Sequence, residues 1–391
     1  MIHNALTSEH LAFRDSLRAF IKKEILPHVD QWEKQGQIDR NIWKKMGDMG
    51  FLGLNFPEDL GGLQLDFYYS MIFCEELSKC FSGGFTISAL VIQFMSAPYL
   101  WKYGSADLQK RYLQGVISGD LVSAIAITEP GAGSDVKNIQ TTAVRDGDDY
   151  IVNGAKTFIT NGYYGDFFIT AVKTDPNAGT KGMSLLVIDR NATGVSAQKI
   201  EKMGWHASDT AELHFDQVRV PVANLVGIEG SGFTYLMGGL QLERLTAAIH
   251  SLATAESALH YALDYIQNRS AFNQKLKDFQ VLRHSIAQME ADILVQKAFV
   301  KHCCDLQEQQ VYAVKECSIA KLQASELAIR VVNQCLQFFG GYGFTEDYKL
   351  ARMYRDVRVG TIIGGTSEIM LEIIAKMTID QVEYKPSTPN N

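Results

Sequence analysis

The chain has 391 residues, of which 46% are hydrophobic and 21% charged, and its formal net charge is −7. This length predicts two or three domains with a large core, and the composition is ordinary for a globular protein. The acidic balance argues against nucleic acid or an anionic membrane as the main partner. A small anionic molecule held by a few local cations or backbone N–H groups remains compatible with it.

No targeting or membrane segment is expected. The first seven residues lack a basic stretch followed by an apolar core, and the first 30 contain several acids, unlike a transit peptide. No apolar run approaches membrane-spanning length. The six cysteines form no C-x-x-C pair, so we expect reduced thiols and neither a disulfide nor a metal site. These features together predict a cytoplasmic protein.

Apolar residues recur at helical spacing through the first 122 residues, and Pro27, Pro57 and the Gly61-Gly62 pair interrupt the pattern. The predicted helices are residues 6–23, 40–50, 67–79, 87–103 and 107–118. We therefore expect residues 1–122 to form an α-helical N-terminal domain.

The period changes between residues 123 and 231, where short β-rich runs are separated by turn signals such as Asn153-Gly154 and Asn161-Gly162. The predicted strands are residues 150–152, 167–172, 184–188, 212–215 and 218–220. Short strands without intervening helices suggest a middle domain built as an antiparallel sandwich or barrel.

Helical spacing returns in residues 232–380, which we expect to form a C-terminal helical bundle. The predicted helices are residues 233–269, 280–304, 312–338 and 364–376. Residues 381–391 form a polar tail with no predicted structure. The fold class is therefore α+β and multidomain, with helices on both sides of a β-domain.

The first of the C-terminal helices carries the most informative residues. Between Gly230 and Ala255 the only acidic or basic residues are Glu243 and Arg244, apart from the titratable His250. A helix that is apolar nearly all round lies inside a bundle, so Glu243 is predicted to be buried, with a pKa raised towards that of a general base. On this helix alone, a structural ion pair with another helix is the better interpretation.

Two polar, glycine-containing stretches stand in the β-domain. Residues 127–135 contain two glycines that let a backbone approach a ligand, with Thr128 and Ser134 offering hydroxyls. They are not a dinucleotide fingerprint, because Val136 replaces the third glycine and no βαβ unit surrounds them. In residues 154–162, Phe158 stands on a strand, where an aromatic residue belongs to the core more often than to a stacking site.

Two further glycine pairs lie in the C-terminal region. Gly340-Gly341 follows an apolar helix and is explained by a helix C-cap and turn. Gly364-Gly365 precedes the last helix, for which Thr366 or Ser367 would be the N-cap. A helix N-terminus is also a natural anion site. Each of these motifs has a structural explanation when taken alone.

Taken together, in their order and spacing, the motifs resemble the acyl-CoA dehydrogenase flavoproteins over nearly the whole chain. The motifs are residues 128–135, Gly204 with Ser208-Asp209-Thr210, Arg269-Ser270-Ala271-Phe272, Gln337-Phe338-Phe339-Gly340-Gly341 and Arg355-Asp356. The resemblance implies an N-terminal helical domain, a middle β-domain and a C-terminal four-helix bundle. It also implies a homotetramer, or at least a homodimer, with FAD between the β-domain and the bundles of two subunits.

The resemblance further implies which positions contact FAD. The flavin ring would be lined by Thr128, Ser134, Phe158 and Thr160. The diphosphate and ribityl part of a neighbouring subunit's FAD would be held by Arg269, Phe272 and Gln280. The adenine half would be contacted by Gln337, Gly340 and Gly341. A further contact near the last helix would come from Thr366 and Glu368.

One departure from the common pattern identifies the branch. Many relatives carry the catalytic glutamate just before the Gly-Thr of the last motif, where this chain has Gly364. The isovaleryl- and long-chain-specific branches instead carry it within Glu-Arg-Leu on the central helix, which matches Glu243-Arg244-Leu245. The resemblance therefore implies Glu243 as the catalytic base. It implies substrate contacts at Ser134, Arg244 and Gly364.

The implied reaction is FAD-dependent α,β-dehydrogenation of an acyl-CoA thioester to the trans-2-enoyl-CoA, in fatty-acid or branched-chain acyl catabolism. Electrons would pass to an electron-transfer flavoprotein. An acyl-CoA oxidase, a dehydrogenase acting on acyl-carrier-protein thioesters and a catalytically inactive flavin-binding oligomer are the alternatives, and Glu243 argues against the last. Residues 75–81 and 93–99 are expected to line the acyl pocket.

Overall fold

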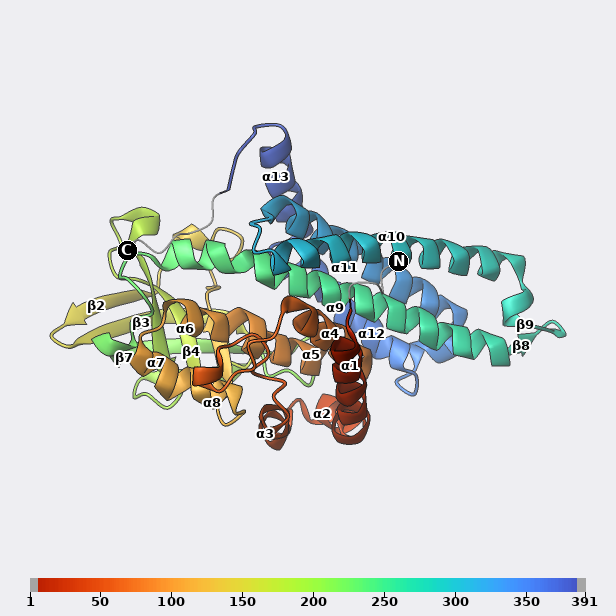
Figure 1. The fold of residues 1–391 in the computed structure, drawn as a ribbon, viewed down its shortest axis with the longest axis horizontal. Helices are drawn as coiled ribbons and strands as arrows, with labels where there is room; N and C mark the ends of the chain where they lie inside the picture. Colours follow the sequence, from red (N-terminus) through yellow and green to blue (C-terminus); the bar gives the residue numbers. More distant parts are fainter. Residues whose placement is uncertain (1–5, 385–391) are drawn as a thin grey trace.

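The computed structural model describes residues 6–384, in which helices come first, a β-sheet follows and long helices complete the chain (Figure 1). This order confirms the predicted α+β architecture. The domain limits after residues 122 and 231 stay predictions. Residues 381–384 of the expected polar tail form no helix or strand, and the remainder of that tail lies outside the described residues.

The first region is helical, as its apolar spacing predicts. Its helices are α1 (Ser8–Phe20), α2 (Val29–Gln35), α3 (Asn41–Asp48), α4 (Phe67–Leu77), α5 (Gly83–Leu90), α6 (Ala97–Tyr103), α7 (Ala106–Leu108) and α8 (Gln114–Ile117). Turns of π-helix continue or connect these helices at Ile21–Ile25, Val91–Ser96 and Gln109–Leu113. Helix α2 escaped the sequence analysis because seven residues are too few to establish a period.

The expectation about apolar runs was wrong in one place. Helix α5, the π turn and α6 form one continuous helix, Gly83–Tyr103, whose 21 residues are long and apolar enough to cross a membrane by length and composition. However, 83% of its most apolar window is buried inside the protein. A core helix packed on several sides has this composition without any membrane.

One seven-stranded sheet makes up the second region, with strand order β1-β4-β2-β3-β7-β6 and β5 paired to β4. Its strands are β1 (Ser123–Ala126), β2 (Thr142–Asp146), β3 (Asp149–Ile159), β4 (Phe167–Lys173), β5 (Met183–Asp189), β6 (Val195–Lys199) and β7 (Ala211–Pro221). Strands β1, β2 and β6 were not predicted from the sequence. Strand β1 runs parallel to β4, so the sheet is mixed rather than purely antiparallel. The long excursion between these two strands allows the chain to return in the same direction.

Strand β4 shows how the sheet joins the helices. All seven of its residues are buried, because alternate side chains enter different cores. Phe167 and Ile169 belong to the large core shared with the helices, whereas Phe168 and Val172 belong to the smaller core inside the curled sheet. The sheet is therefore covered on one face by helices and on the other by its own curl.

The third region contains the three longest helices of the described residues, α9 (Gly232–Asn268), α10 (Gln280–Glu308) and α11 (Val314–Phe338), followed by α12 (Lys349–Val357) and α13 (Ser367–Thr378). A small hairpin of β8 (Ser270–Ala271) and β9 (Gln274–Lys275) connects α9 to α10. Helix α12 was not predicted. It is short and lies between two glycine motifs, where the apolar period is hard to recognise.

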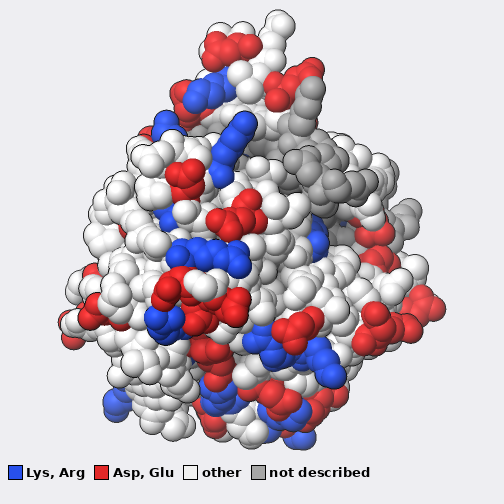
Figure 2. Space-filling view, turned by 90° about the vertical axis from the view of Figure 1, so that its left-hand side faces the viewer, with Lys and Arg blue, Asp and Glu red and all other residues white. Residues whose placement is uncertain are grey.

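The end of the molecule that carries the sheet has a mixed surface. Figure 2 shows acidic and basic side chains interspersed over this face. Surface ion pairs contribute to the pattern, and one example is Arg219, which contacts Asp146 at 2.7 Å and Asp149 at 3.2 Å.

A buried ion pair attaches the loop before β2 to strand β3. The ammonium of Lys156 is completely buried and lies 2.7 Å from the Glu129 carboxylate, which also accepts a hydrogen bond from the Thr141 backbone at 3.0 Å. Burial lowers the pKa of Lys156 to about 8, although the carboxylate opposes this shift. The ammonium of Lys156 and the carboxylate of Glu129 therefore stabilise each other's charged form inside the protein.

Replacing Lys156 by Met should destabilise the protein by about 3–5 kcal/mol, because Glu129 would remain buried without a counter-ion. The double variant Lys156→Met with Glu129→Gln should lose clearly less unfolding free energy than the single variant. Urea unfolding of the three proteins at neutral pH measures the difference. Equal losses in the single and double variants would show that the ion pair does not act as a unit.

Candidate active site

The candidate site is built around Glu243 in the N-terminal third of α9. Neighbouring residues of α9 such as Leu245, Ala248 and Ile249 are buried in the large helical core, so this part of the helix is covered on most sides. Glu243 and Arg244 are both buried, as the sequence predicts. A carboxylate in such a place needs a polar partner.

That partner is Tyr99 in the first turn of α6, whose hydroxyl donates a 3.0 Å hydrogen bond to Glu243 Oε1. Among the described residues no Lys, Arg or His forms an ion pair with Glu243, so the structural ion pair favoured from the helix alone is wrong. Gly239 makes the contact possible, because a Cβ at this position would lie 2.1 Å from the Tyr99 oxygen. The sequence analysis did not single out Gly239 for this role.

The environment of Glu243 raises its pKa to about 7. Burial is the main cause, since a dry environment disfavours the charged form, while the hydrogen bond from Tyr99 and the charge of Arg244 act in the opposite direction. A carboxylate with a pKa near neutrality is suited to take a proton as a general base.

Arg244 lies beside Glu243 in sequence, but no ion pair joins their side chains among the described residues. Burial lowers the pKa of its guanidinium, and its Nε has no hydrogen-bond partner in residues 6–384. The charge of Arg244 also contributes to lowering the pKa of Lys321, after burial, to about 8. Lys321 Nζ in turn donates a 2.7 Å hydrogen bond to the backbone oxygen of Gly365, which fixes the loop before α13.

This loop carries two of the predicted site residues, Gly364 and Thr366, and the first turn of α13 carries a third, Glu368. Gly364 has φ +62°, and a Cβ there would point into open space. The Thr366 hydroxyl accepts a 3.2 Å hydrogen bond from the Ile369 N–H, which confirms the predicted N-cap of α13. Glu368 is exposed, and hydrogen bonds from its own backbone N–H and from Thr366 lower its pKa.

A second part of the site is the loop that contains Thr128 and Ser134. Glu129 and Ala132 exchange backbone hydrogen bonds of 3.0 and 3.1 Å, so the loop is a tight turn with an exposed Ser134. A Cβ at Gly131 or at Gly133 would meet nothing within 4 Å. The turn therefore presents open backbone at its rim.

Phe158 lies next to this turn, because the Thr157 N–H donates a 2.9 Å hydrogen bond to the Thr128 oxygen. The interpretation of Phe158 as a core residue is wrong, since 66% of its surface is exposed. The register of β3 against β7 shifts at this point, and Phe158 adopts φ +59°, which turns the ring outwards. Thr160 follows on the same segment and is partly buried.

The remaining predicted cofactor residues lie at the opposite end of the molecule, beyond the C-terminus of α9, around the β8–β9 hairpin (Figure 1). Arg269 and Tyr342 are in contact there, with the guanidinium 5.5 Å from the ring centre. Phe272 is 90% exposed. The other members of this group are also exposed, namely Gln280, Gln337, Gly340 and Gly341.

The two groups do not meet within one chain. Arg269 follows Glu243 by 26 residues on the same helix, which corresponds to about 39 Å along the axis. The fold therefore joins Glu243 to Tyr99, places the Thr128 and Phe158 segments side by side on the sheet, and leaves the Arg269 group apart. Both groups offer what a flavin nucleotide requires, namely open glycine backbone, exposed aromatic rings and, in the Arg269 group, an exposed guanidinium.

A helical region, a curled sheet and a helical bundle fit a class of multidomain α+β proteins, and the buried carboxyl of raised pKa is suited to proton transfer. Family models identify the class. Residues 7–120, 124–218 and 230–379 match the N-terminal, middle and C-terminal domains of acyl-CoA dehydrogenases.

Individual proteins agree with these models. The chain is 39% identical to the mitochondrial long-chain specific acyl-CoA dehydrogenase of Sus scrofa over 96% of its length and 87% of that protein. An acyl-CoA dehydrogenase structure from Geobacillus kaustophilus is 43% identical, with a TM-score of 0.94 and coverage of 96% and 99%. A glutaryl-CoA dehydrogenase from Mycobacterium smegmatis in complex with FADH2 is 25% identical, with a TM-score of 0.91 and 97% coverage of both chains. The protein belongs to the acyl-CoA dehydrogenase family, which is FAD-dependent.

Replacing Tyr99 by Phe should raise the pKa of Glu243, because the hydrogen bond from the hydroxyl favours the carboxylate. If Glu243 is the catalytic base, it works when deprotonated, so the rise of kcat/KM with pH, expected near pH 7 in the native enzyme, should move to higher pH. A pH profile of kcat/KM measures the shift. Tyr103→Phe, a neighbouring tyrosine without this contact, is the control, and an unchanged profile in Tyr99→Phe would contradict the assigned role.

Proposed function

We propose that the protein removes a proton and a hydride from neighbouring carbons of an acyl-CoA thioester and forms the trans-2-enoyl-CoA. The single observation that carries this proposal is Glu243, a buried carboxylate with a pKa of about 7 on a rigid helix. FAD, when bound, supplies the acceptor for the β-hydride. The enzyme's own side chains account for the proton.

Glu243 takes the α-proton at its carboxylate oxygen. The α-carbon of a thioester is only weakly acidic, so the developing negative charge on the thioester oxygen needs a hydrogen-bond donor. Gly364 retains its backbone N–H although it has no side chain, and we assign that donor to it. Arg244 and Ser134 are the further substrate contacts that we propose.

The cofactor positions are proposed on the same basis. Thr128, Ser134, Phe158 and Thr160 form the group on the sheet that would line the flavin ring, with Thr366 and Glu368 near the last helix. The group beyond α9 would hold the diphosphate and adenine parts of a cofactor bound to a neighbouring subunit. Its members are Arg269, Phe272, Gln280, Gln337, Gly340 and Gly341. Their separation within one chain supports a site completed by a second subunit, so we propose a homotetramer, or at least a homodimer.

The electrons would leave through an electron-transfer flavoprotein, and the substrates would be fatty or branched acyl-CoA thioesters. We place the enzyme in the cytoplasm, where its six buried free cysteines would stay reduced.

Replacing Glu243 by Gln should abolish nearly all flavin reduction while acyl-CoA still binds, since the amide keeps the shape but not the basicity. A loss of at least ~10²–10⁴-fold is expected for a missing general base. Anaerobic bleaching of the flavin by an acyl-CoA series, together with the binding affinity, measures both effects. Asp209→Asn removes another buried carboxyl of raised pKa, outside the proposed site, and serves as the control. Near-normal reduction by Glu243→Gln would overturn the assignment.

A second variant tests the geometry. Glu243→Gln with Gly364→Glu moves the carboxylate to the loop before α13, where a side chain has open space. We expect partial recovery of flavin reduction with an altered chain-length preference, since the new side chain occupies pocket volume. Recovery should be incomplete, because φ +62° at this position strains any residue other than glycine.

Replacing Arg269 by Ala should weaken FAD retention, because an arginine–phosphate contact is charge-assisted. The flavin-to-protein ratio after gel filtration, with the oligomeric mass from light scattering, measures the effect. Arg219→Ala removes an equally exposed arginine from strand β7 and is the matched control. A monomer that retains FAD and turns over would contradict the shared site.

A further inference from the structure

The segment between strands β1 and β2, residues 127–141, carries two of the proposed flavin contacts, Thr128 and Ser134. We call it the flavin loop. Its middle is exposed or half-buried except at Ala132 and Ile139. A loop with so few buried contacts has little packing to fix its shape. Its conformation therefore depends mainly on how its two ends are held.

Strand β3 holds the start of the flavin loop with two consecutive residues. Lys156 Nζ donates a 3.0 Å hydrogen bond to the Ile127 backbone oxygen and lies 2.7 Å from Glu129 Oε1. The Thr157 N–H donates a 2.9 Å hydrogen bond to the Thr128 oxygen. Lys156 thus bonds to the residues on both sides of Thr128, and its neighbour bonds to Thr128 itself.

The Glu129 carboxylate holds the other end of the flavin loop. It accepts hydrogen bonds from the backbone N–H groups of Gln140 at 2.5 Å and Thr141 at 3.0 Å. Gly154 on β3 lets Thr141 lie against the strand, because a Cβ there would be 2.5 Å from the Thr141 hydroxyl. The pair formed by Lys156 and Glu129 therefore closes the flavin loop at its base.

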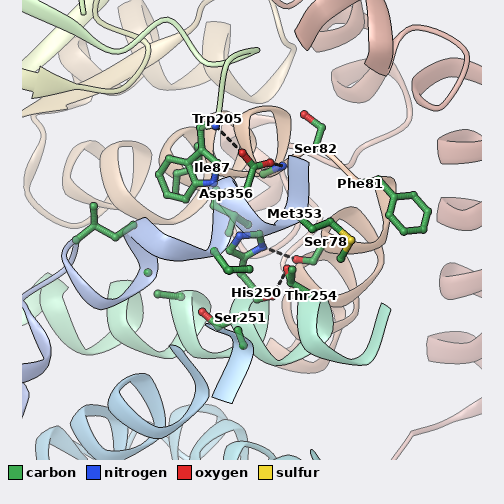
Figure 3. Close-up of a pocket in the computed structure, with 17 residues that line it drawn as sticks. Ser78, Phe81, Ser82, Ile87, Trp205, His250, Ser251, Thr254, Met353 and Asp356 are labelled. Atoms are coloured by element: carbon green, nitrogen blue, oxygen red, sulfur yellow. Dashed lines mark hydrogen bonds between the residues drawn. The ribbon is translucent and has the colours of Figure 1, made fainter. Parts of the chain in front are cut away.

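Lys156 keeps the Glu129 carboxyl ionised, as a second buried carboxyl shows by contrast. Asp356 accepts a 2.6 Å hydrogen bond from the Trp205 backbone N–H, but no ion pair joins it to a cation among residues 6–384 (Figure 3). Burial, and after it the charge of Glu33, raise the pKa of Asp356 to about 7. Burial acts on Glu129 in the same direction, yet the charge of Lys156 and the hydrogen bonds bring its pKa below the usual value. An ionised carboxylate accepts at both oxygens, whereas a protonated carboxyl carries a donor on one of them.

Stability alone does not explain why a buried ion pair stands at this place. Replacing such a pair by uncharged residues of similar volume is often neutral or stabilising, because the desolvation of two charges offsets their attraction. What this pair specifies is a backbone conformation, since its contacts join residues 127–129 and 140–141 to strand β3.

We infer that Lys156 is a positioning residue for the cofactor, which holds the flavin loop in the shape that receives the flavin ring. It acts through Ile127 and Glu129, and it is itself completely buried, so it needs no contact with the flavin. This role rests on the proposed cofactor positions Thr128 and Ser134. An ion pair with a purely structural role is the competing explanation.

The double variant Lys156→Met with Glu129→Gln separates the two explanations, because it leaves no unpaired charge in the core. We expect the Kd of the holoenzyme for FAD, measured from the free flavin in ultrafiltrates, to rise by about tenfold to a hundredfold, the effect of one or two lost charge-assisted hydrogen bonds. Glu129→Gln alone keeps the packing but replaces one accepting oxygen by an NH2 group. It should show a smaller rise, and it provides the test if the double variant does not fold.

A second measurement reports on the loop itself. Lys137 is exposed in the middle of the flavin loop, and Lys181 is exposed in the turn between β4 and β5. At saturating FAD, trypsin should cleave the double variant faster than the native protein after Lys137 and equally fast after Lys181. Lys297→Met with Glu256→Gln removes another 2.7 Å ion pair, between α9 and α10, and should change neither FAD affinity nor cleavage.

Either a native FAD affinity or unchanged cleavage after Lys137 in the double variant would overturn the inference. Failure of the proposed cofactor position is distinguishable with Thr128→Ala. This variant removes the proposed hydroxyl contact but keeps the backbone oxygen that accepts from Thr157. It should weaken FAD binding without faster cleavage after Lys137, and an unchanged FAD affinity would refute the position of Thr128 at the flavin.

Discussion

The burial of one carboxylate is the constraint on which the candidate site depends. Glu243 stays in the core because Tyr99 donates a hydrogen bond to it, and Tyr99 can approach because Gly239 has no side chain. The two partners belong to different regions, since Tyr99 lies in the first turn of helix α6 and Glu243 lies in the C-terminal helix α9. The pKa of the Glu243 carboxyl is therefore a property of how these regions pack, not of either one alone.

The sequence predicts Glu243 and its burial for a simple reason. Glu243 and Arg244 are the only charged residues in an otherwise apolar part of the helix. Such a helix has no polar face to turn towards solvent, so both residues are predicted to be buried. The same reasoning could not supply Tyr99, because the two residues are 144 positions apart and their contact depends on the packing of separate helices. For Phe158, the sequence predicts burial and the structure shows an exposed ring. Its place on a strand indicates burial, but a local shift in register turns the ring outwards.

Motif order and spatial order also differ. The cofactor motifs follow one another along the chain as one series, yet the fold separates them into a group on the sheet and a group beyond α9 (Figure 1). A 37-residue helix forces this separation, since it is rigid and about 55 Å long. If the two groups serve one ligand, as proposed, a second copy of the chain must supply the missing half. The length of α9 thus determines whether one chain can form the whole proposed cofactor site. The order of the motifs in the sequence does not reveal this distance.

The position of the base also has consequences for rigidity. Gly364 lies in a loop at φ +62°, where glycine costs little and a glutamate would be strained. Glu243 instead projects from a helix fixed on several sides by packing, so its carboxylate has little freedom to follow the substrate. If Glu243 is the base, the substrate must therefore be brought to the carboxylate by contacts elsewhere in the site. The hydrogen bond from Tyr99 and the packing of α9 fix the carboxylate, and with it one end of that geometry.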